Sequence, residues 1–279
     1  MKINRILNLD TYPLDQPESA RGRKLVQDIR EDLARDGSCV LPDFVTPGAL
    51  EIMASQAATL EDVAYAGPTS VPPYYFNYHL GEDLDVDEQH PLKRRGRRIL
   101  KQVAGDLIPG DHLLSVLFHS PLMTHLLGLV LGQPVYRNTD RYQSLNINLQ
   151  DEGGCQQWHF DTAHMVTTLL LQAPESGGVF EYCPHIRSDQ DENFEEVRKV
   201  LDQASRRTKQ LNLEAGMLSL FQGHYSMHRV TEVKGPIKRI QAILGYTTVP
   251  GLTGSRESSI LHYGPRVAEL EGHNKIQDL

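Results

Sequence analysis

Residues 165–182 read MVTTLLLQAPESGGVFEY, which is a run of β-branched and aliphatic residues, a turn and a second short run. The turn lies at 175–178, where one serine and two glycines interrupt the pattern. Runs of the same kind recur at 134–137, 143–149, 209–213, 217–221, 227–232 and 238–248. Many short runs separated by turn signals predict a β core of sandwich or barrel type.

The N-terminal half is predicted to be mainly helical. Leu25, Ile29 and Leu33 recur every four residues, which predicts a helix over 18–35 that ends at Gly37. A short strand should follow at 38–41, and Thr46-Pro47 is typical of the first residues of a helix. The remaining expectations are a loop over 66–92 and helices over 47–60, 93–104, 110–117 and 120–131.

The β-rich half contains one predicted helix, over 191–204, and an irregular tail from Gly251. The chain therefore has an α+β composition, which 279 residues can fold as one domain. We expect three parts in this domain: a mainly helical region 1–133, a β core 134–250 and a C-terminal tail 251–279.

The overall charge argues against a nucleic acid partner. The chain carries 28 Lys and Arg against 36 Asp and Glu, a net charge of -8, whereas nucleic acid binding needs a basic surface. The basic run 93–98 is the exception, and we interpret it as a solvated helix face or as a means of gathering an anionic group.

Three sparse cysteines predict no disulfide framework, which fits a reducing cytoplasm. No apolar stretch reaches the roughly 20 residues of a membrane helix, and the first residues lack the features of a signal peptide. We therefore expect a soluble cytoplasmic protein with no membrane partner.

The tetrapeptide Trp158-His159-Phe160-Asp161 suggests a metal site. Side chains two apart in a strand share a face, so His159 and Asp161 can hold one ion between them. His228 begins another predicted strand, and two imidazoles with one carboxylate form the facial triad suited to iron(II). Arg239, on the next predicted strand, could pair bidentately with a dicarboxylate cosubstrate.

The pattern WHFD, GGVFEY and LFQGHYSMHRV followed by Arg239 resembles the iron(II)/2-oxoglutarate-dependent dioxygenase superfamily over roughly 135–250. The fuller segment GGVFEYCPHIRS at 177–188, with Asp191-Glu192-Asn193, is similar to a bacterial branch that hydroxylates or halogenates free amino acids, including the lysine halogenases. The resemblance implies a double-stranded β-helix (jelly roll) core. It also implies iron(II) on His159, Asp161 and His228, with His224 as the rival distal ligand.

The same resemblance implies cofactors and a reaction. Arg239 would bind the far carboxylate of 2-oxoglutarate, and O2 would be the second cosubstrate. Radical halogenases of the superfamily have Gly or Ala where this chain has Asp161, and chloride binds iron in that space. Asp161 therefore favours hydroxylation of an unactivated C–H bond in a free amino acid, lysine or a similar polar one, while 2-oxoglutarate is decarboxylated to succinate.

Two other functions remain open at this point. One is a 2-oxoglutarate oxygenase that hydroxylates or desaturates another small natural-product intermediate, and the other is a non-catalytic, cupin-like binding module. Homodimerisation is plausible, although nothing in the sequence establishes it.

Several polar residues are candidates for the pocket, each with an ordinary surface or packing role as the alternative. Asn146 could help to bind 2-oxoglutarate, and Arg94 could clamp a substrate carboxylate. The others are Asp140 for a substrate amine, Thr162 and His164 for the pocket lining, and Tyr263 for closure over the substrate.

Overall fold

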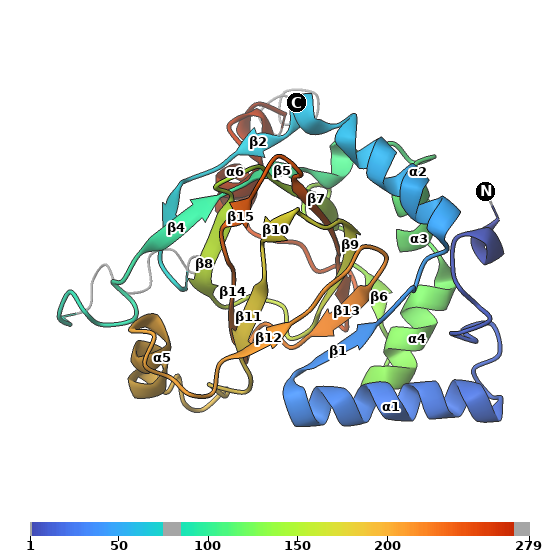
Figure 1. Cartoon of the computed structure of the whole chain (residues 1–279), viewed down its shortest axis with the longest axis horizontal. Helices are drawn as coiled ribbons and strands as arrows, with labels where there is room; N and C mark the ends of the chain where they lie inside the picture. The colour runs from blue at the N-terminus through green and yellow to red at the C-terminus, as the bar shows by residue number, and fades with distance from the viewer. Residues whose placement is uncertain (1, 75–84, 271–279) are drawn as a thin grey trace, which may run out of the picture.

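The computed structural model describes residues 2–74 and 85–270, and antiparallel strands form its centre (Figure 1). The larger sheet has seven strands in the order β1 (Ser38–Leu41), β13 (Leu218–Phe221), β9 (Val166–Gln172), β16 (Arg239–Leu244), β7 (Leu145–Gln150), β5 (Lys101–Val103) and β2 (Tyr65–Ala66). The six-stranded sheet has the order β12 (Lys209–Leu211), β11 (Phe180–Cys183), β14 (Met227–Val230), β8 (Cys155–His159), β4 (Gly96–Ile99) and β3 (Ser70–Val71). The predicted jelly-roll core is confirmed.

Two short ribbons complete the strands, β10 (Ser176–Gly177) with β15 (Val233–Lys234) and β6 (Tyr136–Arg137) with β17 (Tyr246–Thr247). The α-helices whose bounds lie within the described residues are α1 (Ala20–Asp36), α2 (Pro47–Ala58), α3 (Leu113–Phe118), α4 (Pro121–Leu131), α5 (Phe194–Leu201) and α6 (Arg256–Tyr263). In the same part of the chain, 3-10 turns lie at Ile3–Arg5, Glu61–Val63 and Gly105–Leu107. None of the described helices is long and apolar enough to cross a membrane.

The larger sheet is apolar toward the helices and polar toward the space between the sheets. On β7, Leu145, Ile147 and Leu149 join the main hydrophobic core with α1 to α4, which lie along that side in Figure 1. Asn146 and Asn148 alternate with them and therefore point the other way. An edge-to-face contact between the rings of Phe180 and Phe221, whose centroids are 5.0 Å apart, connects the two sheets.

Side-chain caps and a glycine define the helix ends, and the signals predicted at Gly37 and Thr46 are among them. Ser19 and Thr46 accept hydrogen bonds from main-chain nitrogens of the first turns of α1 and α2. Gly37 ends α1 with a φ of 66°, a left-handed conformation that glycine adopts without strain. The predicted helix over 191–204 is confirmed in a shorter form as α5.

Two predictions were wrong. Residues 93–104 form no helix but the strands β4 and β5, because pairing with β8 and β7 outweighs the weak helical pattern of a charged run. The tail from Gly251 contains α6, which Ser255 caps through the nitrogen of Ser258. Within the predicted loop over 66–92, β3 pairs with β4, and 75–84 lie outside the described residues.

Candidate metal centre

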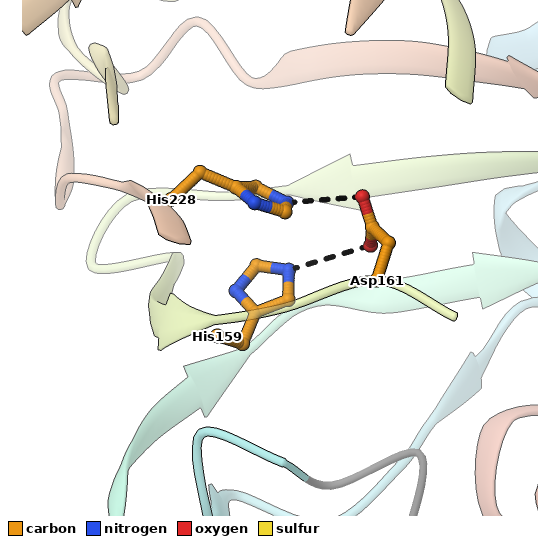
Figure 2. A group of neighbouring side chains, drawn as sticks. All are labelled: His159, Asp161 and His228. Carbon is orange, nitrogen blue, oxygen red and sulfur yellow. Dashed lines mark ion pairs between the residues drawn. The ribbon is translucent and has the colours of Figure 1, made fainter. Parts of the chain in front are cut away.

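His159, Asp161 and His228 converge between two neighbouring strands (Figure 2). His159 ends β8 and lies directly across from His228 on β14. The carboxylate of Asp161 lies between the two rings, with its oxygens 3.9 Å from Nε2 of His159 and 3.3 Å from Nε2 of His228. Three donor atoms so close together can bind one ion.

A β-bulge in β8 sets the direction of the first ligand. The register between β14 and β8 runs from His228 opposite His159 to Val230 opposite Gln156, so β8 contains one extra residue. Gln156 and His159 therefore share the inner face, and their side chains are in contact at 3.0 Å. Trp158 packs on the other face in a second hydrophobic cluster with α5.

Main-chain carbonyls orient both imidazoles for metal binding. Nδ1 of His159 lies 2.8 Å from the carbonyl oxygen of Gln157, and Nδ1 of His228 lies 3.0 Å from that of Ser226. A proton on each Nδ1 leaves the Nε2 lone pair directed at Asp161, which is the arrangement seen around metal-binding histidines. Burial lowers the pKa of His159 to about 3, with a further contribution from His228, and lowers that of His228 to about 4.

The third ligand is held by its main chain and by a glycine. The nitrogen of Asp161 donates to the carbonyl of Gly223 at 3.1 Å, and a Cβ on Gly223 would lie 1.9 Å from a carboxylate oxygen of Asp161. Only glycine at 223 therefore leaves room for the carboxylate. Burial raises the pKa of Asp161, while the charges of His159, His224 and Arg187 lower it.

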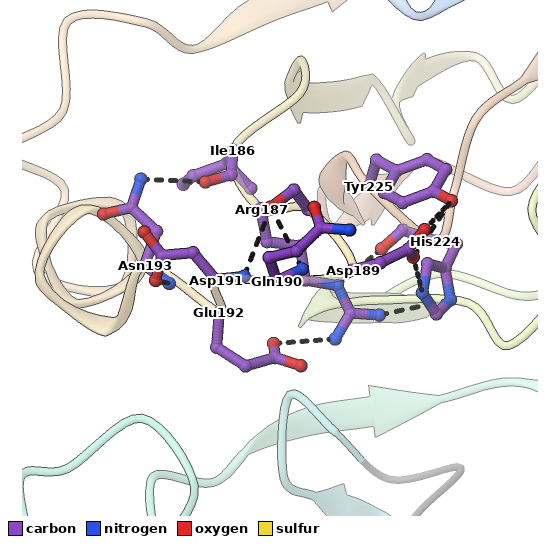
Figure 3. Close-up of polar contacts among 10 residues, drawn as sticks. Ile186, Arg187, Asp189, Gln190, Asp191, Glu192, Asn193, His224 and Tyr225 are labelled. Atoms are coloured by element: carbon purple, nitrogen blue, oxygen red, sulfur yellow. Dashed lines mark hydrogen bonds and ion pairs between the residues drawn. The ribbon is translucent and has the colours of Figure 1, made fainter.

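The side chain of Arg187 packs against the residue that precedes Asp161. Its guanidinium lies 4.0 Å from the centroid of the ring of Phe160, the residue between His159 and Asp161 in the sequence. It also donates to Glu192 at 2.9 Å and to the carbonyl oxygen of His224 at 2.6 Å (Figure 3). The segment that resembles the amino-acid hydroxylase and halogenase branch thus packs against the metal ligands.

Arg239 supplies a buried cation on the inner face of the larger sheet. It lies opposite Gln150 in the β16–β7 register and donates to the Gln150 side chain at 3.2 Å. Within the described chain, Nη2 of Arg239 and Nε2 of Gln150 have no hydrogen-bond partner. Burial lowers the Arg239 pKa to about 10, so the group remains charged at neutral pH. A carboxylate ligand would satisfy both orphaned donors.

Arg98 was missed because a helix was predicted there. Its position on β4 lies opposite Gln156 of β8, which places it one strand away from His159 on the inner face. The side chain is only 2% exposed and donates to Gln102, which in turn donates to Asn148 at 2.9 Å. No local sequence signal identified this position, because residues 96–99 form a strand through pairing with β8.

Two of the predicted substrate residues have structural contacts. The Asp140 carboxylate accepts from the nitrogens of Tyr142 and Gln143 through one oxygen and from that of Gly254 through the other, which joins the C-terminal tail to the segment before β7. Arg94 pairs with Asp202 at 2.7 Å beside α5. Substrate binding at either residue would have to compete with these bonds.

The other predicted pocket residues divide between buried and exposed positions. Asn146 is buried on the inner face of β7, in line with Gln150. Tyr263 is buried in a third cluster with Tyr142 and Val267. Thr162 and His164 are exposed on the loop that follows Asp161.

His224, the rival ligand, lies outside the triad. Its Nε2 is 3.9 Å from the carboxylate of Asp189, and its ring is 4.9 Å from that of His164. Burial lowers the pKa of His224, as does the charge of Arg187. The structure therefore groups His228, and not His224, with His159 and Asp161.

A family model described as Halogenase D matches residues 82–257, which is more than half of the chain. The match includes all three residues of the triad and Arg239. Among curated proteins, no sequence matches the chain.

Solved structures with the same fold include AviO1 from Streptomyces viridochromogenes Tue57, with a TM-score of 0.56 and 15% identity over 82% of this chain and 97% of that one. HygX from Streptomyces hygroscopicus, solved with nickel, 2-oxoglutarate and hygromycin B, has a TM-score of 0.54 and 14% identity over 82% and 89%. A 2OG-Fe(II) oxygenase family protein from Burkholderia pseudomallei has a TM-score of 0.50 and 15% identity over 81% and 92%. At this identity the likeness concerns the fold.

Proposed function

Since the chain belongs to the Halogenase D family, we propose that it is an iron(II)- and 2-oxoglutarate-dependent hydroxylase of a free amino acid with a polar side chain, such as lysine. His159, Asp161 and His228 would hold the iron, and Arg239 would hold the far carboxylate of 2-oxoglutarate. When bound, iron(II) with 2-oxoglutarate and O2 supplies an oxidant for an unactivated C–H bond, and 2-oxoglutarate leaves as succinate and CO2.

The observation that carries the proposal is the carboxylate of Asp161 between the two imidazoles. This donor set fits iron(II), because three protein ligands on one side leave positions open for a cosubstrate and O2. In a radical halogenase chloride binds iron in the place of the carboxylate ligand, and Asp161 fills that place here. Hydroxylation therefore suits this chain better than halogenation, although its family is named for halogenases.

Arg239 and Gln150 support 2-oxoglutarate as the cosubstrate. Both donors are buried and belong to side chains that contact each other, and a planar guanidinium can pair with a carboxylate through two parallel hydrogen bonds. HygX, which shares the fold, was solved with 2-oxoglutarate bound. A binding module of the cupin kind would not require this buried arginine beside a metal site.

Arg98 supports an amino acid as the substrate. Its buried cation lies one strand from His159, while Arg94 is occupied at the surface by Asp202. We propose that Arg98, and not Arg94, meets the substrate carboxylate. The amides of Gln102 and Asn148 continue this polar surface and could meet the polar groups of the substrate.

A substrate screen tests the proposal. The purified chain is incubated with iron(II), 2-oxoglutarate, ascorbate and each free amino acid, and products are read by mass spectrometry. We expect substrate-dependent succinate together with a product that has gained one oxygen atom. An Arg98→Met variant should raise the KM for that substrate, whereas the Arg94→Met control should not. If no amino acid stimulates succinate formation, the amino-acid assignment is wrong.

A further inference from the structure

A second group of metal-binding side chains lies beside the first. His164, Asp189 and His224 each offer a ligand atom, and the three atoms lie within 4.8 Å of one another. His164 comes from the loop after the triad's Asp161, Asp189 from the loop before α5, and His224 from the turn before β14. Three loops distant in sequence therefore bring two imidazoles and a carboxylate together.

The separations within this cluster resemble those of the triad. Nε2 of His224 is 3.9 Å from Oδ1 of Asp189, as far as Nε2 of His159 is from Asp161. Ligands at about 2.0–2.2 Å from one ion are some 3–3.5 Å apart. His164 and Asp189 are exposed, so small rotations of their side chains would close the remaining distance.

The neighbouring side chains orient the ligand atoms. The Arg187 guanidinium lies 3.4 Å from Nδ1 of His224, and Nε2 of the same ring faces Asp189 (Figure 3). An ion bound at Nε2 would shift the imidazole proton to Nδ1, so the long contact with Arg187 would have to open. Glu192 pairs with Arg187 at 2.9 Å and offsets its charge. The Tyr225 hydroxyl lies 3.1 Å and 3.3 Å from the two oxygens of Asp189 and 3.5 Å from His164, so it already joins two members of the cluster.

We propose that His164, Asp189 and His224 form a second site for a divalent transition metal such as zinc, nickel or cobalt. Imidazole nitrogens suit these ions, and water would complete the coordination at an exposed site. This site should bind more weakly than the triad, because exposed loops must be ordered around the ion. The proposal does not depend on the reaction that the triad catalyses.

The position of the cluster links it to the triad. His224 directly follows Gly223, whose carbonyl accepts from the nitrogen of Asp161, and Arg187 joins His224 to the Phe160 ring. An ion on His224 and Asp189 would therefore fix the loop over 186–193 against the strand end that carries the first site.

Zinc titration of the metal-free, tag-free full chain tests the proposal, with a chromophoric chelator as competitor. We expect two equivalents of zinc for the wild type and one for each of the variants His164→Ala and Asp189→Asn. The control His125→Ala removes an exposed histidine on α4 and should still bind two. An Asp161→Ala variant should keep the weaker equivalent, which separates the second site from the first.

Circular dichroism before zinc addition checks that each variant is folded. The proposal is overturned if the wild type binds a single equivalent. It is also overturned if the weaker equivalent survives in both His164→Ala and Asp189→Asn.

Discussion

Within residues 2–74 and 85–270, two groups of two histidines and one aspartate could each hold a metal ion, and the two groups differ in how the chain positions them. The buried triad of His159, Asp161 and His228 is anchored on paired strands, with carbonyls fixing both rings. The second cluster lies on loops, and two of its three members are exposed. The hydroxyl of Tyr225 contacts its Asp189 and His164. The same three residue types thus lie in a rigid, buried arrangement in one place and in an exposed, loop-borne arrangement in the other.

The largest difference should appear when the two carboxylates are changed in the same way. Asp161→Gly should lower hydroxylation by at least about 100-fold, because even groups that only support a metal ligand contribute up to that factor. Asp189→Gly should lower hydroxylation by less than about tenfold, because Asp189 affects the triad only from a distance. Succinate and hydroxylated product, measured with and without chloride, give the comparison. An Asp161→Gly variant that hydroxylates at the parent rate would show that Asp161 is not a ligand.

The buried cation of the cosubstrate site offers the next test. Arg239→Lys keeps the charge but loses the planar fork, so the KM for 2-oxoglutarate should rise about 10- to 100-fold, the value of one or two charge-assisted hydrogen bonds. Lys238→Met is the matched control, since Lys238 pairs with Glu61 and Asp151 on the outer side. Equal KM values for the two variants would contradict the assignment of Arg239.

Gly223 tests how tightly the triad is packed. A methyl group there meets the carboxylate of Asp161, so Gly223→Ala should lower the free energy of unfolding by about 1–3 kcal/mol. In the Asp161→Gly background the carboxylate is absent, so the new methyl group does not collide with it. Gly223→Ala should then lower the free energy of unfolding by less than half as much. Urea unfolding of the metal-free variants measures both values. Equal costs in the two backgrounds would mean that Gly223 is needed for another reason.

The smallest effect concerns His262, a third buried imidazole near the triad. Burial, followed by the charge of Arg98, lowers its pKa to about 3. In the unfolded chain His262 binds a proton below about pH 6.5, whereas in the folded chain it does so only near pH 3. The contribution of neutral His262 to the stability of the folded chain is therefore complete above about pH 6.5 and falls as the pH approaches 3. His262→Gln should reduce the pH slope of the unfolding free energy by up to about 1.4 kcal/mol per unit at pH 4–5. An unchanged slope would contradict this.

Regular patterns made much of the fold predictable. The alternation over 143–149 located β7, and the signals at Gly37 and Thr46 located the end of α1 and the start of α2. The His-x-Asp spacing identified two members of the triad that the structure brings together with His228.

Features that depend on distant partners were not predictable from local pattern. Residues 96–103 form strands only because β8 and β7 pair with them, so Arg98 was misplaced. The bulge that turns His159 inward depends on the register with β14. The second cluster joins three loops whose contacts follow from the folded chain alone.

Absorption spectroscopy under anaerobic conditions tests the central claim most directly. Iron(II) is added to the metal-free chain, and 2-oxoglutarate is then titrated while the metal-to-ligand charge-transfer band is followed. We predict a band that saturates at one iron and one 2-oxoglutarate per chain, is lost in His228→Ala and needs more 2-oxoglutarate in Arg239→Lys. The absence of a band in the wild type, or an undiminished band in His228→Ala, would contradict the claim that this triad binds iron for a 2-oxoglutarate-dependent reaction.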